Sequence, residues 1–305
     1  MKREHFDAWA AAELDAVESA LSVWVPTDAP AGLGEAMRYG VLDGGKRLRP
    51  LLVLAAAQAV DGEREAALRA ACAVELIHAY SLVHDDMPCM DNDVLRRGKP
   101  TVHVKYGEAQ AMLAGDAMQA LAFEVLTPCA GDKSALPGSG GVAPALQARL
   151  CALLARAAGH AGMAGGQAID LASIGKALDE HALRDMHRRK TGALLKTSVL
   201  MGAACGPVGR ETWNALAAYG EALGLAFQVV DDILDVTQAS ETLGKTAGKD
   251  LDNNKPTYVS VLGLDAARAH ALELRAQAQA ALARSALADT SALALLADKV
   301  VERDN

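Results

Sequence analysis

The sequence predicts an all-α protein, and three features of its composition support this. Of 305 residues, 51% are hydrophobic but only 4% are aromatic, so the apolar content comes mainly from aliphatic side chains. Ala- and Leu-rich runs such as "ALRAACAVEL" and "LQARLCALLARAAG" favour close-packed helices. Patterns typical of strands are nearly absent. Because no linker, charge run or internal repeat divides the chain, we expect one domain over residues 1–305.

Apolar residues recur at helical spacing along most of the chain, beginning with "HFDAWAAAELDAVESALSVWV". The pair Asp61-Gly62 favours a turn and separates the second predicted helix from the third. Gly, Pro and Ser gather in residues 128–144, which predicts a surface loop. The predicted helices cover residues 5–25, 49–60, 65–86, 108–126, 143–173, 180–204, 211–236, 265–288 and 291–302.

Charge and cysteine content narrow the class of protein. A formal net charge of −8 argues against general nucleic-acid binding, which needs a basic surface. The five cysteines are odd in number and widely spaced, so we expect reduced core residues and neither disulfides nor a zinc site. The first twenty residues contain no uninterrupted apolar stretch, and the longest apolar runs are too short to span a bilayer. These features predict a cytoplasmic protein with no membrane span.

Two acidic clusters carry the strongest functional signal. In "FQVVDDILDVT", Asp231 and Asp235 are four residues apart on a periodic helix, which places both carboxylates on one face about 6 Å apart at Cβ. Such a pair can hold a hard cation, although it is also typical of a solvated helix face. The flanking residues weaken that alternative because they are apolar: Val229, Val230, Ile233 and Leu234.

The other cluster lies in "LVHDDMPCMDNDVLRRGKPT". Asp85 and Asp91 are six residues apart, which on an ideal helix points their side chains in different directions. Pro88 lies between them and ends or distorts a helix, so we expect a bend that brings Asp91 back towards Asp85. Two arginines, Arg96 and Arg97, follow immediately.

The excess of carboxylates needs a compensating positive charge. Facing carboxylates on two helices would repel by about 3 kcal/mol per close pair at an effective dielectric constant near 20. Oxygen-only ligands, with no Cys or His at ligand spacing, suit Mg²⁺. A phosphate held by Mg²⁺ still has oxygens for an arginine to bind. The first cluster and its arginines therefore predict a metal-bridged phosphate site.

Basic residues elsewhere indicate a second anion. The segment "DGGKRLRP" supplies Lys46, Arg47 and Arg49 at the start of an apolar helix, where free backbone N–H groups also favour anions. An ordinary basic first turn is the alternative for this segment alone. Three further lysines lie near Gly or Pro and are weak signals individually: Lys190, Lys245 and Lys255.

Several segments, in order along the chain, resemble the motifs of trans-isoprenyl diphosphate synthases. They are "GGKRLRP", "HAYSLVHDDMPCMDNDVLRRGKPT", "GMAGGQAIDL", "HRRKTGALL", "GLAFQVVDDILD" and "LGKTAGKDLDNNKPTY". The resemblance covers essentially the whole chain and is to the bacterial short-chain enzymes of the farnesyl diphosphate synthase type. It implies a bundle of mostly antiparallel helices around a deep central cavity, usually as a homodimer. The implied reaction joins isopentenyl diphosphate to dimethylallyl or geranyl diphosphate, giving farnesyl diphosphate and pyrophosphate.

The resemblance also implies a metal site. Asp85, Asp91 and Asp231 would ligate three Mg²⁺ ions that hold the allylic diphosphate. Asp86 and Asp235 would act through water or through outer contacts.

The remaining roles concern the two substrates. The region of Thr191 and the side chain of Gln228 would face the developing carbocation. The released pyrophosphate is the base that the family implies for the final proton loss, so no protein base is required. His84 and Gln167 are equally consistent with structural roles and stay outside the predicted site. The allylic diphosphate would be bound by Arg96, Lys190, Lys245 and Lys255, and isopentenyl diphosphate by Lys46, Arg49, His78 and Arg97.

Chain length is predicted from the turn that precedes the first acidic cluster. The growing tail should run back along this helix, so Tyr80 and Ser81 point into its path. The bulky Tyr80 would floor a short pocket, which favours a fifteen-carbon product. A geranyl or geranylgeranyl product remains an alternative.

Two further alternatives differ in class. A class I terpene cyclase also ionises an allylic diphosphate with Mg²⁺, but the basic "GGKRLRP" segment favours two substrates. A non-catalytic regulatory subunit would often lack motif aspartates, and all are present here. The tail "LADKVVERDN" either folds over the cavity mouth, with Arg303 near the ligands, or frays.

Overall fold

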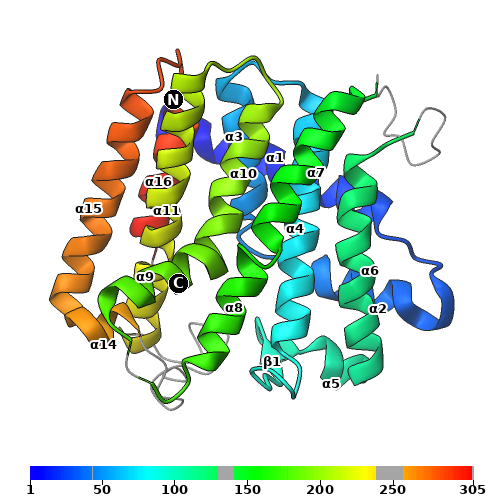
Figure 1. The fold of residues 1–305 in the computed structure, drawn as a ribbon. Helices are drawn as coiled ribbons and strands as arrows, with labels where there is room; N and C mark the ends of the chain where they lie inside the picture. The colour runs from blue at the N-terminus through cyan, green and yellow to red at the C-terminus, as the bar shows by residue number, and fades with distance from the viewer. Residues whose placement is uncertain (43, 130–140, 177, 238–256, 304–305) are drawn as a thin grey trace.

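The computed structural model describes residues 1–305 except 43, 130–140, 177, 238–256 and 304–305 (Figure 1). Among the described residues, the regular elements are helices and one short hairpin, in which β1 (Leu95–Arg96) pairs antiparallel with β2 (Lys99–Pro100). The predicted all-α class is therefore confirmed.

Two short segments depart from α-helical geometry: η1 (Pro30–Gly32) is a tighter 3₁₀ turn and η2 (Arg188–Gly192) is a wider π-helical turn. The α-helices are α1 (Arg3–Trp24), α2 (Leu33–Val41), α3 (Leu48–Ala59), α4 (Arg64–Asp85), α5 (Val102–Tyr106), α6 (Glu108–Leu126), α7 (Pro144–Ala158), α8 (Met163–Ala172), α9 (Glu180–His187), α10 (Ala193–Ala204), α11 (Arg210–Thr237), α14 (Tyr258–Leu262), α15 (Leu264–Ala283) and α16 (Ser291–Val301).

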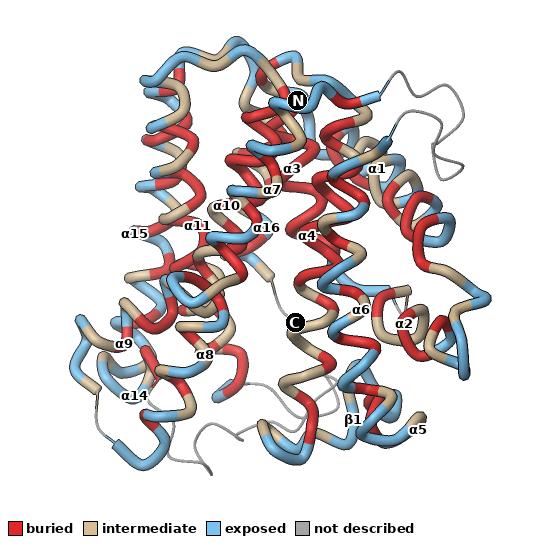
Figure 2. The backbone as a smooth tube through the Cα atoms, turned by 45° about the vertical axis from the view of Figure 1, so that its right-hand side comes forward, coloured by how far each residue is buried: buried red, intermediate tan, exposed pale blue. Residues whose placement is uncertain are grey.

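The long helices pack in a series across the molecule. Helix α6 packs on α4, α4 on α3, α3 on α10, α10 on α11, and α11 on α15. Helix α4 is largely buried, as its red colour in Figure 2 shows. Within the described part of the chain, α4 is the one helix long and apolar enough to cross a membrane, but 78% of the relevant window is buried in the fold. This burial is typical of a core helix.

Glycines allow the helices that carry the site to approach closely. A Cβ on Gly202 of α10 would lie 2.1 Å from the carbonyl oxygen of Val53 on α3. A Cβ on Gly224 of α11 would lie 2.8 Å from the Cα of Gly192 in η2. Larger residues would push these elements apart, because a Cβ cannot approach backbone so closely. The residues that follow Gly224 on α11 are thereby held close to η2.

Several helix boundaries differ from the prediction. The predicted helix 143–173 is divided into α7 and α8, because the backbone of Gly162 is not helical (φ −118°, ψ −127°). Residues 180–204 are one succession of α9, η2 and α10, as predicted. Helix α15 ends at Ala283, five residues before the predicted end. Periodicity did not reveal the short elements, which carry too few residues for a repeat: α2, α5, α14 and the β1–β2 hairpin.

The cysteines are all free, but their expected burial is wrong for three of them. Cys72 and Cys205 are buried in helices, as predicted. Cys89 and Cys129 are exposed, because they lie in the segments that follow α4 and α6, and Cys151 is half-buried on α7.

Candidate active site

An open cavity of about 390 Å³ lies between α4 and α8, and α3 and η2 also contribute to its wall. Much of the α8 side is apolar, with Met163, Ala164 and Leu171. An apolar wall beside charged groups suits a ligand that has a charged head and an apolar tail. Seven predicted site residues line this cavity: Arg49, His78, Tyr80, Ser81, Asp85, Lys190 and Thr191.

The first acidic cluster forms where α4 ends. The helix stops at Asp85, and the chain then turns past Pro88. The Asp91 N–H donates to the Asp85 carbonyl oxygen at 2.8 Å, and the Asn92 N–H donates to the Met87 carbonyl oxygen at 3.0 Å. This turn returns Asp91 to the end of α4, which is the bend that Pro88 predicts.

Asp85 lies in a setting that disfavours its negative charge. Burial raises the pKa of Asp85 to about 6; the positive charge of Lys190 opposes this shift, and the negative charge of Asp91 adds to it. A divalent cation at this position would supply the missing positive charge and keep Asp85 ionised.

Asp86 lies beside Asp85 but is held by the protein. It is 3% exposed, and Arg96 binds it with Nε 2.9 Å from both carboxylate oxygens and Nη2 2.6 Å from one of them. Because a guanidinium has more donors than this pair uses, Arg96 can also contact a ligand. In this structure Arg96 therefore positions Asp86 at the edge of the cluster.

The second acidic cluster lies within α11 rather than at a helix end. Asp232 is 2% exposed and accepts hydrogen bonds from Gln228 Nε2 and from the Tyr258 N–H, both at 2.8 Å. Asp235 is 7% exposed, whereas Asp231 is half-buried and faces the C-terminal residues. The three carboxylates thus have different surroundings although they share one motif.

Arg303 contacts the second cluster, a position that the sequence left open. Its Nη2 donates to Asp231 Oδ1 at 3.1 Å and to the Phe227 carbonyl oxygen at 2.9 Å. The guanidinium carbon lies 4.1 Å from the centre of the Phe227 ring. The side chain is 10% exposed, so Arg303 folds over the site.

The η2 turn joins α8 to α11 through two pairs of side chains. Lys190 Nζ lies 2.6 Å from Asp170 Oδ2 on α8, and the Thr191 hydroxyl donates to Gln228 Oε1 on α11 at 3.0 Å. Asp170 is 4% exposed and was not identified from the sequence. A single charged residue in the otherwise uncharged "GGQAIDL" run was the available signal, because a buried carboxylate needs a partner.

The basic residues of "DGGKRLRP" lie in different places, with Arg49 at the cavity and Arg47 in the core. Arg49 lines the cavity, is 9% exposed, and its buried Nε has no hydrogen-bond partner among the described residues. Burial lowers the pKa of Arg49 to about 10, so it remains positive at neutral pH. Arg97 donates to the Gly44 carbonyl oxygen, which brings the β1–β2 hairpin onto the segment that holds Lys46. Arg47 turns inward instead, because its φ of 44° directs its side chain to Glu18 and Glu75, both at 2.6 Å.

His78 adds a neutral polar group to the cavity. Its pKa lies well below the usual value because burial and the nearby positive charges of Arg49 and Arg97 disfavour the imidazolium. His78 is therefore neutral at physiological pH and can accept as well as donate a hydrogen bond.

The acidic residues suit Mg²⁺ that is shared with a ligand. Among the described residues, no group of three or more His, Cys, Asp or Glu side chains is placed to hold a metal ion by itself. Mg²⁺ is commonly held by one or two carboxylates together with water and phosphate oxygens, so this arrangement fits an ion that arrives with a diphosphate. Two predicted ligands of that diphosphate, Lys245 and Lys255, lie outside the described residues.

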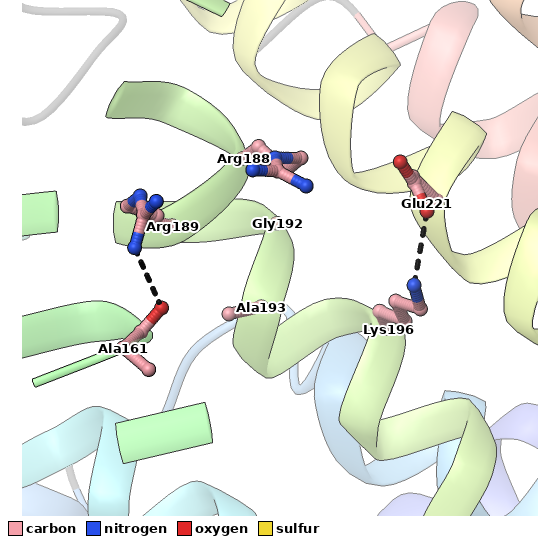
Figure 3. A pocket seen from close by; sticks show the side chains of 7 residues that line it. All are labelled: Ala161, Arg188, Arg189, Gly192, Ala193, Lys196 and Glu221. Atoms are coloured by element: carbon pink, nitrogen blue, oxygen red, sulfur yellow. Dashed lines mark hydrogen bonds and ion pairs between the residues drawn. The ribbon is translucent and has the colours of Figure 1, made fainter. Parts of the chain in front are cut away.

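A smaller hollow of about 190 Å³ lies between η2, α10 and α11, and shares no residue with the cavity (Figure 3). Its cationic side chains are already engaged. Lys196 pairs with Glu221 at 2.9 Å, and Arg188 and Arg189 both pair with Asp185. We assign no ligand to it.

Comparison with known proteins identifies the family. The polyprenyl synthetase family model matches residues 30–292. A chloroplastic geranylgeranyl pyrophosphate synthase of Arabidopsis thaliana is 46% identical over 95% of this chain and 79% of its own. The farnesyl diphosphate synthase of Escherichia coli is 47% identical over 88% of this chain and 89% of its own. A solved geranyltransferase of Helicobacter pylori, complexed with magnesium and isoprenyl diphosphate, aligns with a TM-score of 0.81 at 33% identity, covering 96% of this chain and 95% of that one.

The chain is therefore a prenyltransferase of the polyprenyl synthetase family, whose members extend prenyl chains.

Proposed function

We propose that this enzyme is a farnesyl diphosphate synthase, which condenses isopentenyl diphosphate with dimethylallyl or geranyl diphosphate and releases pyrophosphate. One observation supports the Mg²⁺-dependent condensation most directly. The buried Arg49, with an unpartnered Nε, and Asp85, with its raised pKa, line the same cavity. A buried guanidinium with an unused N–H group and a buried carboxylate whose negative charge is disfavoured suit a site for an anion and a cation together.

The residues of the two clusters would hold the metal and the allylic diphosphate. Asp85, Asp91 and Asp231 would ligate Mg²⁺, three ions by family resemblance, with Asp86 and Asp235 supporting them. Mg²⁺ stabilises the negative charge that develops on the leaving diphosphate. The diphosphate would also be bound by Lys190, Arg96, Lys245 and Lys255.

The second substrate would occupy the basic side of the cavity. Lys46, Arg49 and Arg97 would bind the diphosphate of isopentenyl diphosphate, and neutral His78 would add a hydrogen bond. The double bond of isopentenyl diphosphate then attacks the allylic carbon of the other substrate as the carbon–oxygen bond to the leaving diphosphate breaks. The Thr191 main-chain carbonyl and the Gln228 amide would stabilise the positive charge, and pyrophosphate would take the proton that is lost.

Tyr80 and Ser81 are our proposed determinants of chain length. Both line the cavity on α4, one turn before Asp85. A geranylgeranyl product is the second candidate, because the geranylgeranyl and farnesyl relatives are equally similar to this chain.

We further propose a cytoplasmic homodimer in which each chain is one domain over 1–305. Support for the dimer comes from the exposed apolar side chains on α6, Met112 at 41% and Leu113 at 54%. Such side chains on an outer helix face suit a contact with a second copy.

The test is incubation of the purified protein with Mg²⁺, dimethylallyl diphosphate and isopentenyl diphosphate, followed by dephosphorylation and mass identification of the alcohols. We expect farnesol, and no elongation when Mg²⁺ is chelated. Geranylgeraniol would support the second candidate. No elongation, with cyclic hydrocarbon formed from farnesyl diphosphate alone, would indicate a terpene cyclase and reject the proposal.

A further inference from the structure

We propose that Gln167 on α8 is a further catalytic residue, whose amide contacts the allylic group while its bond to the diphosphate breaks. This inference rests on the proposed function. The amide oxygen would face the carbon that becomes positive, and the amide N–H would donate to an oxygen of the departing diphosphate.

Gln167 has a buried amide that makes no hydrogen bond to the described residues. Gln167 lines the cavity together with Asp85, Lys190 and Thr191. Both Gln167 Nε2 and Oε1 are buried, and neither has a hydrogen-bond partner among the described residues. A buried amide without partners is unfavourable for folding, so its presence in the cavity wall is best explained by a bound ligand.

Helix α8 is fixed on both sides of Gln167. A Cβ on Gly166 would lie 2.2 Å from the Lys190 nitrogen, so α8 and η2 meet backbone to backbone there. Three residues after Gln167, Asp170 pairs with Lys190 Nζ at 2.6 Å. Gln167 is therefore held in a defined position relative to Lys190 and Thr191, as preorganised electrostatic stabilisation requires.

Gln167 differs from Gln228, the other glutamine of the site. Gln228 uses both ends of its amide within the protein, since Oε1 accepts from Thr191 at 3.0 Å and Nε2 donates to Asp232 at 2.8 Å. In Gln167, neither the acceptor Oε1 nor the donor Nε2 makes a hydrogen bond to the described residues. A neutral amide also suits this place better than a carboxylate, which would add to the negative charge beside Asp85.

The test compares Gln167→Leu and Gln167→Met with the wild type. Because no hydrogen bond within the protein is lost, we expect the thermal midpoint of the ligand-free variants to be unchanged or higher. We expect the single-turnover rate with geranyl diphosphate to fall about 10- to 100-fold, and the KM for isopentenyl diphosphate to change by less than about threefold.

Gln228→Met is the matched control for stability. It removes the hydrogen bonds that Gln228 makes with the Thr191 hydroxyl and with the buried Asp232, so its thermal midpoint should fall. A wild-type single-turnover rate in both Gln167 variants would overturn the inference while leaving the proposed function intact. A lowered thermal midpoint with a proportionate loss of active protein would assign Gln167 a structural role and also overturn it. No elongation by the wild type would reject the proposed function and this inference together.

Discussion

The two acidic clusters contain the same kind of residue but are built differently. In the first, α4 ends at Asp85, the chain returns through Asp91, and burial raises the pKa of Asp85 to about 6. In the second, α11 continues through the cluster and the protein supplies a cation, because Arg303 lies 3.1 Å from Asp231. One carboxylate is thus left in need of positive charge, whereas the other is already paired. If Asp85 and Asp231 hold Mg²⁺ as proposed, Asp85 would offer the ion an open site at the end of α4, whereas Asp231 would first have to release Arg303.

The largest expected effect is on turnover, and it should distinguish Asp231 from its neighbour Asp232 in the second cluster. Asp231→Asn should lower kcat about 1,000-fold or more, because a metal ligand acts on the transition state, with little change in thermal midpoint. Asp232→Asn should instead lower the thermal midpoint, because the buried Asp232 accepts from Gln228 and Tyr258. Steady-state kinetics and calorimetric melting of both variants measure this. Near-wild-type turnover of Asp231→Asn would reject the metal role.

The next largest effect is on the pH dependence of the free energy of unfolding, through Asp85 in the first cluster. A folded-state pKa raised above the ordinary 3.8 means that folding favours protonated Asp85. This contribution is fully present below pH 3.8 and is lost as the pH rises through about 6. Without metal, Asp85→Asn should therefore stabilise the protein by about 1–3 kcal/mol at pH 8 and by much less at pH 4.

Urea unfolding in the presence of a chelator, at both pH values, measures that difference. Asp116→Asn, at an exposed position on α6, is the control and should show no pH-dependent gain. An equal gain for Asp85→Asn at pH 4 and pH 8 would contradict the assigned cause.

A smaller effect is expected for the cation of the second cluster. Arg303→Met removes the partner of Asp231, so the affinity for Mg²⁺ together with inorganic pyrophosphate should rise about three- to tenfold, whereas Arg303→Lys should stay near the wild type. Calorimetric titration with Mg²⁺ in the presence of saturating inorganic pyrophosphate measures this. Equal Mg²⁺ affinity in all three proteins would mean that Arg303 does not compete with the metal.

Substitutions of Tyr80 and Ser81 on α4 should have the smallest effect on turnover but should change the length of the product. Tyr80→Ala should lengthen the products, because it deepens the cavity, and Ser81→Phe should shorten them. Turnover should change by less than about tenfold, since the proposed mechanism gives neither residue a role at the reacting carbon. Chromatography of the dephosphorylated alcohols measures the distribution. Unchanged product lengths in both variants would reject Tyr80 and Ser81 as determinants of chain length.

The sequence predicted the features that depend on local rules. Pro88 predicted the bend after Asp85, and spacing placed Asp231 and Asp235 on one helix. Pairings over long separations were not predictable in this way. The direction of Arg47 depends on a left-handed backbone and on Glu18 and Glu75, which only the fold brings near.

The same limit explains what was missed at the site. The partner of Lys190 is Asp170, twenty residues earlier, and Arg303 reaches Asp231 across seventy-two residues. The unused amide of Gln167 is visible only when every neighbour is known. Hydropathy patterns locate helices, but they do not specify which polar groups meet between them.

If the two clusters bind one Mg²⁺–diphosphate complex, as we propose, Asp85 and Asp231 should be energetically coupled, and a double-mutant cycle measures that coupling directly. Binding of a non-hydrolysable geranyl thiodiphosphate with Mg²⁺ would be measured calorimetrically for the wild type, Asp85→Asn, Asp231→Asn and the double variant. We expect each single change to weaken binding strongly and the double change to add little, giving a coupling of at least about 1 kcal/mol. Additive losses, with no coupling between Asp85 and Asp231, would contradict a shared metal–diphosphate site.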